Sequence, residues 1–337
     1  MKIDIFPHIF PVPFFERMAK VAGKAENMVK RTSEIPVLTD LNERFRIMDR
    51  YPDYVQILTL ASPPIETLAD PKNSPELARI ANDGMAEICA KHPDRFPTFA
   101  ASVCMNNMDA CLEEIDRAIN KLGAKGIQIF SNVAGRPLDE PEFRPLFAKM
   151  AQLDLPIWLH PARPSTMPDY PVEKKSRYEI WWTFGWPYET SAAMARIVFS
   201  GMFDQFPDIK IITHHCGAMI PTFEGRTGFG MDQLGARTPD DETDLIKHSL
   251  KRRIGDYFRM FYGDTALFGA LAPLQAGVAY FGCDRILFGT DMPFDPEKGN
   301  GFIRETIRCV DNLQIAPAER QKIYEDNARR LLKLPKK

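Results

Sequence analysis

The stretch IDIFPH at residues 3–8 decides the fold, because this apolar, strand-like run ends in an ionisable side chain, His8. Three later runs end in the same way: PIWLH at His160, IKIITHH at His214 and His215, and RILFGTD at Asp291. A (β/α)8 barrel builds its active site from residues at the carboxyl ends of several separate strands. The sequence therefore predicts a barrel with histidines and an aspartate in its active site, a combination typical of a metal-assisted enzyme.

Strand-like and helix-like segments alternate along most of the chain. Strands are expected at residues 3–9, 54–61, 96–103, 125–130, 155–160, 209–214, 258–264 and 285–291. Helix-length segments between these strands favour a closed parallel sheet over an open, doubly wound one. We therefore expect residues 1–337 to form one α/β domain, a (β/α)8 or TIM barrel.

Two segments do not fit the repeat. Residues 11–45 separate the first two strands by too much for a loop, which predicts a small helical insertion after strand one. Residues 161–186, the aromatic segment, follow strand five at the catalytic end and are rich in Pro, Trp and Tyr. Long loops in compact domains are usually functional, so this segment is expected to cover the substrate. The alternative is a contact between subunits through exposed aromatic side chains.

Composition narrows the class of protein. The formal net charge of −2 argues against nucleic acid or an anionic membrane as the main partner. The start, MKIDIFPHIF, lacks the features of a signal peptide, and no apolar run reaches transmembrane length. The six cysteines are scattered without a CxxC pair and are expected to be reduced thiols. We therefore expect a cytoplasmic protein with a small-molecule partner.

The strand ends predict one divalent metal ion. Strand periodicity places Phe6 and His8 on one face, with His8 at the top of the barrel. Imidazoles of His8 and His160 together with the carboxylate of Asp291 suit Zn²⁺ with an open position, and also Mn²⁺. Such an ion polarises a carboxylate or lowers the pKa of bound water to about 7. For any single histidine, a buried and hydrogen-bonded imidazole without a metal is the alternative.

His214 and His215 are adjacent, and successive residues of a strand point to opposite faces. Only one of them is therefore expected to face the interior. The other is expected to be buried outward, or to support the site through hydrogen bonds from outside it.

Further motifs make a resemblance to a known family visible over nearly the whole chain. They are MKIDIFPHIFP, KGIQIFSNVAGRPLDEPEFRPLF, PIWLHPARP, WTFGWPYET, FPDIKIITHHCGAMIPTFEGR, ILFGTDMPF and NARRLLKL. The sequence resembles the amidohydrolase superfamily, in the branch that holds 2-amino-3-carboxymuconate-6-semialdehyde decarboxylase and the γ-resorcylate and 5-carboxyvanillate decarboxylases. The resemblance implies a distorted (β/α)8 barrel with one divalent metal, commonly zinc.

The resemblance assigns roles to the strand-end residues. It implies that His8, His160 and Asp291 are metal ligands, and that His215 is the acid–base residue, paired with Asp291. His215 stands six residues before Pro221, which is the family's spacing in its Gly-x-x-x-Pro segment. His214 is then the supporting neighbour on the other face.

Phe6 departs from the family pattern. The family places His or Glu here as a further metal ligand, and phenylalanine cannot bind a metal. Three protein ligands suffice for a catalytic zinc site, so the metal can be retained. The alternative is that the metal is lost, and the pocket works without it or has become a binding pocket.

The resemblance also implies where the substrate binds and what it is. Trp182 matches the tryptophan of the active-site loop through the pattern W-x-x-G-x-P-x-E-T. Apart from the resemblance, Arg226, along with Arg136 and Arg163, can pair with a substrate carboxylate, because a guanidinium fork suits that anion. The alternative for each arginine is an ordinary surface or structural ion pair.

The implied activity is a metal-dependent, non-oxidative decarboxylase of an aromatic or conjugated unsaturated carboxylic acid. A homodimer or larger homo-oligomer is expected. The alternatives are a metal-dependent hydrolase or hydratase acting on a lactone, amide or C–C bond, and a degenerate, non-catalytic binding protein supported only by Phe6.

Overall fold

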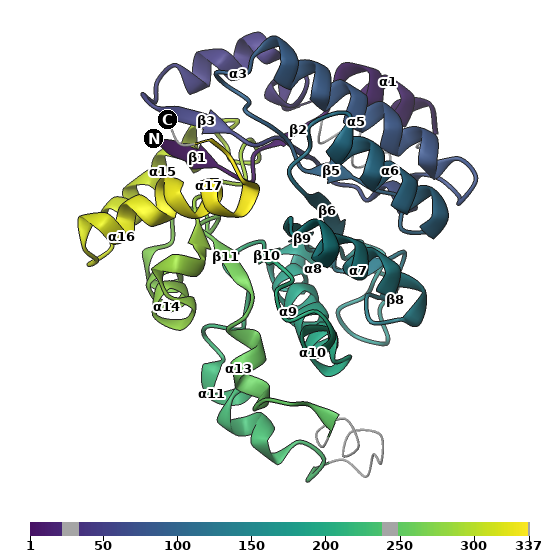
Figure 1. Ribbon diagram of the computed structural model, residues 1–337, viewed down its shortest axis with the longest axis vertical. Coiled ribbons are helices and arrows are strands. Elements are labelled where there is room, and N and C mark those ends of the chain that lie inside the picture. The colour runs from purple at the N-terminus through teal and green to yellow at the C-terminus, as the bar shows by residue number, and fades with distance from the viewer. Residues whose placement is uncertain (22–33, 238–248, 336–337) are drawn as a thin grey trace.

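Parallel strands form a closed (β/α)8 barrel in the computed structural model, which describes residues 1–21, 34–237 and 249–335 (Figure 1). Six strands form one sheet, in the order β5 (Ala101–Ser102), β6 (Ile127–Phe130), β9 (Ile157–His160), β10 (Ile211–Thr213), β11 (Tyr262–Asp264) and β12 (Ile286–Leu287). The first two barrel strands are each broken in two: β1 (Lys2–Asp4) pairs with β3 (Tyr54–Gln56), and β2 (His8–Ile9) pairs with β4 (Thr59–Leu60). The predicted TIM barrel is confirmed.

Backbone contacts close the barrel on both sides of the six-stranded sheet. A parallel bridge between Leu58 and Phe99 joins the second barrel strand to the third. On the other side, the Ile5 amide donates to the Phe288 carbonyl at 2.9 Å, which joins the first strand to the last. Closure leaves no open sheet edge, so every strand can be apolar on both faces.

Helices cover the outside of the barrel. The longer ones are α1 (Val12–Val21), α3 (Leu41–Met48), α5 (Ser74–Lys91), α6 (Met108–Asn120), α7 (Arg144–Leu153), α9 (Gly185–Phe199), α14 (Leu271–Phe281) and α15 (Asn300–Asp311). The shorter ones are α4 (Ile65–Leu68), α8 (Ile180–Thr183), α10 (Met202–Gln205), α11 (Glu224–Thr227), α13 (Ile254–Phe258), α16 (Pro317–Gln321) and α17 (Asn327–Leu332). The remaining described elements are short. They are the 3-10 turns η1 (Pro36–Leu38), η2 (Pro141–Phe143), η3 (Phe229–Gln233) and η4 (Cys283–Arg285), the π-type turn η5 (Lys322–Asp326), and the antiparallel pair β7 (Asn132–Val133) and β8 (Arg136–Pro137).

The structure refines two expectations about boundaries. The seventh strand begins only at Tyr262, because the first residue of the predicted segment, Phe258, ends helix α13. Between the first two barrel strands lie α1, η1 and α3, while residues 22–33 of the predicted insertion fall outside the described residues.

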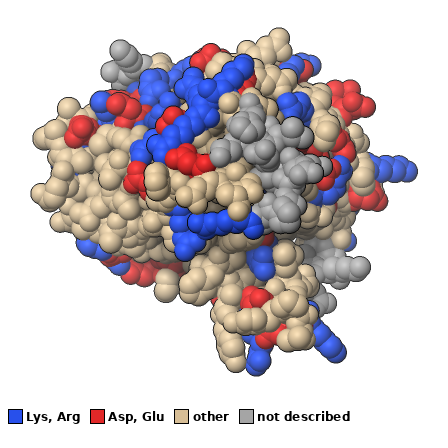
Figure 2. Space-filling view, turned by 90° about the horizontal axis from the view of Figure 1, so that it is seen from below, with Lys and Arg blue, Asp and Glu red and all other residues tan. Residues whose placement is uncertain are grey.

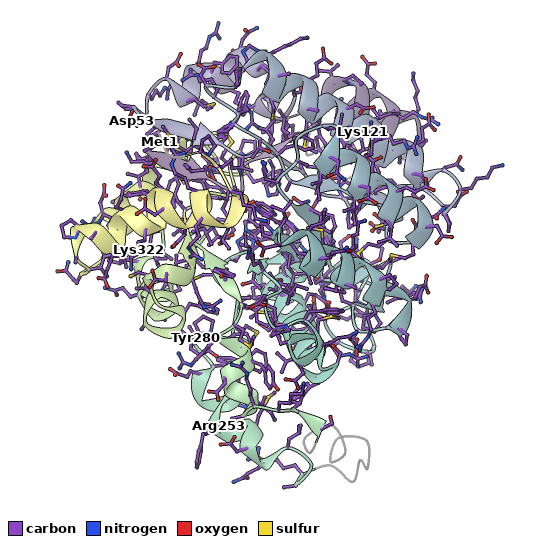
Figure 3. All side chains as sticks on the ribbon, viewed as in Figure 1. Met1, Asp53, Lys121, Arg253, Tyr280 and Lys322 are labelled. Carbon is purple, nitrogen blue, oxygen red and sulfur yellow. The ribbon has the colours of Figure 1, made fainter. Side chains whose placement is uncertain are left out.

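Figure 3 labels Met1 and Lys322 on the same side of the molecule, so the start of the first strand and the turn η5 lie on one side. The amino-terminal ammonium group of Met1 lies 3.0 Å from the Glu325 carboxylate. Basic and acidic side chains are interspersed over the face in Figure 2. Within the described ranges, no helix combines the length and apolar character that crossing a membrane requires.

Candidate active site

Five side chains meet at the carboxyl ends of the barrel strands. We call them the strand-end cluster: His8, His160, His214, His215 and Asp291. They fall into two overlapping groups, each with its ligand atoms within 4.8 Å of one another: His8, His160 and His214 in one, and His214, His215 and Asp291 in the other. All five are buried, and the most exposed, His215, shows 8 % of its surface.

The Asp291 carboxylate joins the two groups. Its Oδ1 atom lies 3.1 Å from His8 Nε2 and 3.4 Å from His214 Nε2. Both nitrogens are fully buried, yet neither has a hydrogen-bond partner among the described residues. Buried polar atoms normally have partners, so these two mark a place where an ion can bind.

Each imidazole of the cluster is held from outside through its δ nitrogen. The partners are Thr59 Oγ1 for His8 (3.2 Å), the Pro161 carbonyl for His160 (2.7 Å), Asp264 Oδ2 for His214 (2.5 Å) and the Ala266 carbonyl for His215 (2.8 Å). Carbonyl and carboxylate oxygens only accept, and the Thr59 hydroxyl already donates to the Pro7 carbonyl at 2.8 Å. The δ nitrogens therefore carry hydrogen, and wherever an imidazole is neutral the lone pair of its Nε2 faces the interior.

Burial and charge set the protonation of these groups. Burial lowers the pKa of His8, and it holds the pKa of His160 well below the usual range. Burial alone would raise the pKa of Asp291, but the neighbouring His214 and His8 hold that pKa well below its usual value. Two neutral imidazoles and one ionised carboxylate are the protonation states that metal ligands require.

The pKa values of the two adjacent histidines, His214 and His215, shift in opposite directions. Burial lowers the pKa of His215 to about 4, so its imidazole is neutral at pH 7. Burial also acts against the charged form of His214, but the carboxylates of Asp264 and Asp291 outweigh it and raise the pKa of His214 to about 9.

The expectation that His214 and His215 face opposite sides is wrong. Their rings stack with centroids 3.8 Å apart, and both reach the cluster. The physical reason is that β10 ends at Thr213, and His215 adopts a left-handed backbone with φ of 56°. Strand alternation therefore does not extend to these two residues.

Phe6 lies in the cluster without contributing a ligand. Its ring stacks on that of His214 with centroids 3.7 Å apart, and its centroid is 5.7 Å from that of His8. Asp4, on the same strand, is no substitute ligand, because its carboxylate accepts from the hydroxyls of Tyr54 and Thr290, both at 2.5 Å.

Two supporting residues were missed by reasoning from the sequence. Arg44 is fully buried, and its guanidinium donates to the His8 carbonyl and, at 2.6 Å, to Gln56 Oε1. Burial lowers the pKa of Arg44 to about 10. No sequence signal marks Arg44. Asp264, the second missed residue, ends the predicted seventh strand, so it could have been found by the strand-end rule, that is, by looking for functional residues at the carboxyl ends of the barrel strands.

A cavity of about 1240 Å³ lies beside the strand-end cluster. Its described walls include Ser62 and Ser131 from loops that follow the strands, together with Arg163, Trp181 and Trp186 from the aromatic segment and α9. None of the five cluster residues lines this cavity. The Trp186 ring lines it and also lies 5.6 Å from the His160 ring, edge to face, so Trp186 stands between the cavity and the cluster.

Trp182 does not line this cavity, whereas Trp181 does. The Trp182 indole donates to Glu179 Oε2 at 2.6 Å, and its ring lies 6.4 Å from that of Trp186. Both tryptophans belong to the short helix α8, where neighbouring side chains diverge by about 100°.

Of the three candidate arginines, only Arg163 lines the cavity. It pairs with Glu189 at 3.1 Å, and its buried Nε atom has no partner among the described residues. Arg136 pairs at the surface with Glu140 and Glu142. Arg226 is exposed on α11, which packs on α13 at the lower end of the molecule, where Figure 3 labels Arg253.

The barrel is closed, and buried imidazoles and a carboxylate lie at its strand ends. This arrangement is typical of the active site of a metal-dependent enzyme. The amidohydrolase family model matches residues 36–334, so the chain belongs to the amidohydrolase family.

Comparison with characterised proteins supports the same placement. The chain is 34 % identical to gamma-resorcylate decarboxylase of Rhizobium sp. (strain MTP-10005) over 307 residues, which cover 88 % of each protein. It is 30 % identical to 2-amino-3-carboxymuconate-6-semialdehyde decarboxylase of Dictyostelium discoideum over 251 residues, 74 % of this chain and 66 % of that protein.

A solved structure is similar over the full length. A dihydroxybenzoic acid decarboxylase from Polaromonas sp. JS666, with bound manganese and the inhibitor 2-nitroresorcinol, matches with a TM-score of 0.77 at 27 % identity. The match covers 100 % of this chain and 98 % of that one. The predicted resemblance to the decarboxylase branch is thereby confirmed.

Proposed function

We propose that this protein is a metal-dependent, non-oxidative decarboxylase of an aromatic carboxylic acid. The observation that carries the proposal is the strand-end cluster, in which two buried imidazole nitrogens without hydrogen-bond partners, His8 Nε2 and His214 Nε2, converge on the Asp291 carboxylate. The relatives named above, all decarboxylases, support the reaction class.

His8, His160 and Asp291 would hold one divalent ion, Zn²⁺ or Mn²⁺. A bound ion supplies positive charge that polarises the substrate carboxylate and an adjacent oxygen. The bound manganese of the Polaromonas enzyme favours Mn²⁺, whereas three nitrogen and oxygen ligands also suit Zn²⁺.

His215 would act as the acid–base residue. Its pKa of about 4 keeps it neutral before substrate binds, and an anionic substrate beside it raises that pKa, so the imidazole takes up a proton. His215 then gives this proton to the ring carbon that carries the carboxylate. The C–C bond breaks, its electron pair stays with the ring, carbon dioxide leaves, and solvent reprotonates His215. Asp291 both binds the ion and orients His215.

The substrate would enter through the cavity beside Trp186. Trp181 and Trp186 offer an apolar wall for a planar ring, and Trp182 supports Trp186 from behind. Arg163 is placed better than Arg226 to meet a carboxylate, because it lines the cavity. We further propose one domain over residues 1–337, a cytoplasmic location and a homo-oligomeric state.

The test uses Mn²⁺-loaded and Zn²⁺-loaded protein with 2,6-dihydroxybenzoate. The expected result is release of carbon dioxide and formation of resorcinol, with no ¹⁸O taken up from labelled water. Uptake of ¹⁸O into the product would instead support a hydrolase or hydratase. Binding of the acid without turnover of any hydroxybenzoate would support the non-catalytic alternative.

A further inference from the structure

We infer that His214 is itself a metal ligand and replaces the strand-one ligand that is lost at Phe6. The inference rests on the proposed function only in taking the strand-end cluster to hold a divalent ion. It assigns to strand six a ligand that relatives with His or Glu at the Phe6 position take from strand one.

Distances are the first argument. Ligands of a tetrahedral ion lie about 2.0–2.1 Å from it, so they lie about 3.3 Å from one another. His8 Nε2 and His214 Nε2 lie 3.1 and 3.4 Å from the same oxygen, Asp291 Oδ1. His214 also shares the three-histidine group with His8 and His160, whereas His215 does not.

The unpaired lone pairs are the second argument. With hydrogen on the δ nitrogens, His8 Nε2 and Asp291 Oδ1 face each other as two acceptors, which repel unless a cation or a proton lies between them. His214 Nε2 is also buried and lies 3.4 Å from Asp291 Oδ1, where a cation or a proton must again stand between the two atoms. One ion bound by His8, His214 and Asp291 would satisfy all three atoms.

The support behind His214 is the third argument. Its Nδ1 atom donates to Asp264 Oδ2 at 2.5 Å, and the other oxygen of Asp264 accepts from the backbone amides of Cys216 and Ala266, both at 3.1 Å. Metal-binding histidines commonly donate their second ring N–H to a carboxylate in this way. His215 has only a backbone carbonyl behind it.

Phe6 supplies the fourth argument. Its ring is stacked at 21° on the His214 imidazole, and the side chain is fully buried. Phe6 therefore fills the space of a lost ligand and fixes the plane of the ring that we assign as its replacement.

The experiment compares His214→Asn with His215→Asn. In both variants the asparagine amide keeps the hydrogen bond made by the histidine δ nitrogen, and only the ε nitrogen is lost. We expect His214→Asn to weaken Mn²⁺ binding by about 100-fold or more, beyond the effect of losing an outer partner. His215→Asn should bind Mn²⁺ as the wild type does. Bound Mn²⁺ per chain is measured by elemental mass spectrometry, and affinity by competition with a chelator.

Two further variants keep the test decisive. Asp264→Asn should weaken Mn²⁺ binding by about 10- to 100-fold. This variant tests the role of His214 if the His214→Asn protein does not fold. Phe6→Glu in the His214→Asn background should restore part of the affinity, because it returns a ligand to strand one.

Wild-type Mn²⁺ affinity in His214→Asn would overturn the inference while leaving the proposed function intact, and so would failure of Phe6→Glu to restore binding in a folded protein. A wild-type protein that binds no divalent ion would overturn both. A His214→Asn variant that keeps its metal but loses turnover would make His214 the acid–base residue instead.

Discussion

The strand-end cluster and the aromatic segment meet where Trp186 of the segment contacts His160, and they are held very differently. The cluster residues are at most 8 % exposed, and every imidazole has a fixed outer partner. In the aromatic segment, Val172, Tyr178 and Phe184 are 94 %, 82 % and 73 % exposed. The barrel strands therefore hold the strand-end cluster in place, while the aromatic segment presents large apolar side chains to the surface.

The largest effect is expected at the centre of the cluster. His160→Ala removes a neutral imidazole of the three-histidine group, so both bound metal and turnover should be lost. Elemental analysis and a carbon dioxide release assay measure the two quantities on one preparation. Full metal content in a folded His160→Ala protein would move the ion site away from strand five.

His215→Asn should separate chemistry from metal binding. Because a positioned acid or base is typically worth about 10²- to 10⁴-fold in rate, turnover should fall by that factor while bound metal stays unchanged. If His215→Asn kept near-normal turnover and His214→Asn did not, the acid–base role would belong to His214. If neither change mattered, the acid–base assignment itself would fall.

The buried carboxyl group of Asp4, in the first barrel strand, should make the free energy of unfolding depend on pH. Burial raises the pKa of Asp4 from 3.8 to about 6, so folding favours its protonated form. Its contribution to stability is therefore present below pH 3.8 and is lost as pH rises through about 6; the pKa difference corresponds to roughly 3 kcal/mol at most.

The matched variant for this effect is Asp4→Asn, which keeps the shape of the side chain and cannot ionise. The free energy of unfolding of wild type minus that of the variant should fall between about pH 4 and pH 6. Denaturant titrations at several pH values measure this difference. A constant difference over that range would mean that Asp4 does not change its protonation on folding.

Trp186 is the residue of the aromatic segment that contacts the strand-end cluster. Trp186→Ala removes an edge-to-face contact with His160 and opens the wall of the cavity. An aromatic contact is worth about 0.5–1.5 kcal/mol, so substrate affinity should fall by up to about tenfold with the fold intact.

Trp182→Ala is the control for that substitution, because Trp182 touches Trp186 and does not line the cavity. Its effect on substrate affinity should be smaller. An equal or larger effect would show that Trp182 reaches the substrate directly, as the family motif implies.

The smallest effect on stability is expected on the outer side of the aromatic segment. Phe184→Glu changes an exposed side chain, so the free energy of unfolding should change by no more than about 0.5 kcal/mol. If the outward aromatic residues join subunits, the molar mass measured by light scattering should fall. An unchanged assembly would leave the segment as a cover for the cavity alone.

The strand-end rule explains why so much of the fold and the site could be predicted. Apolar runs that end in His8, His160 and Asp291 place these residues at one end of the barrel whatever the helices do. The alternation of side chains applies only within a strand, and β10 ends at Thr213. The backbone turn that follows brings His214 and His215 to the same side, and no residue pattern marks that turn.

Contacts between distant segments were also beyond the sequence. Arg44 reaches the His8 carbonyl from a helix 36 positions further along the chain. The different directions of Trp181 and Trp182 depend on a helix of only four residues. The absence of Arg226 from the cavity wall could not be predicted either, because it depends on α11 packing against α13.

The barrel is closed by the same residues that surround the site: the Asp291 amide donates to the Phe6 carbonyl, and the His8 amide donates to the Met292 carbonyl. His8 lies in β2, in the first strand of the barrel, and Asp291 follows β12, the eighth. An ion held by both can bind only after the eighth strand has been synthesised and has docked. Metal uptake would therefore report a closed barrel, and a product truncated before Asp291 would be left without its ion.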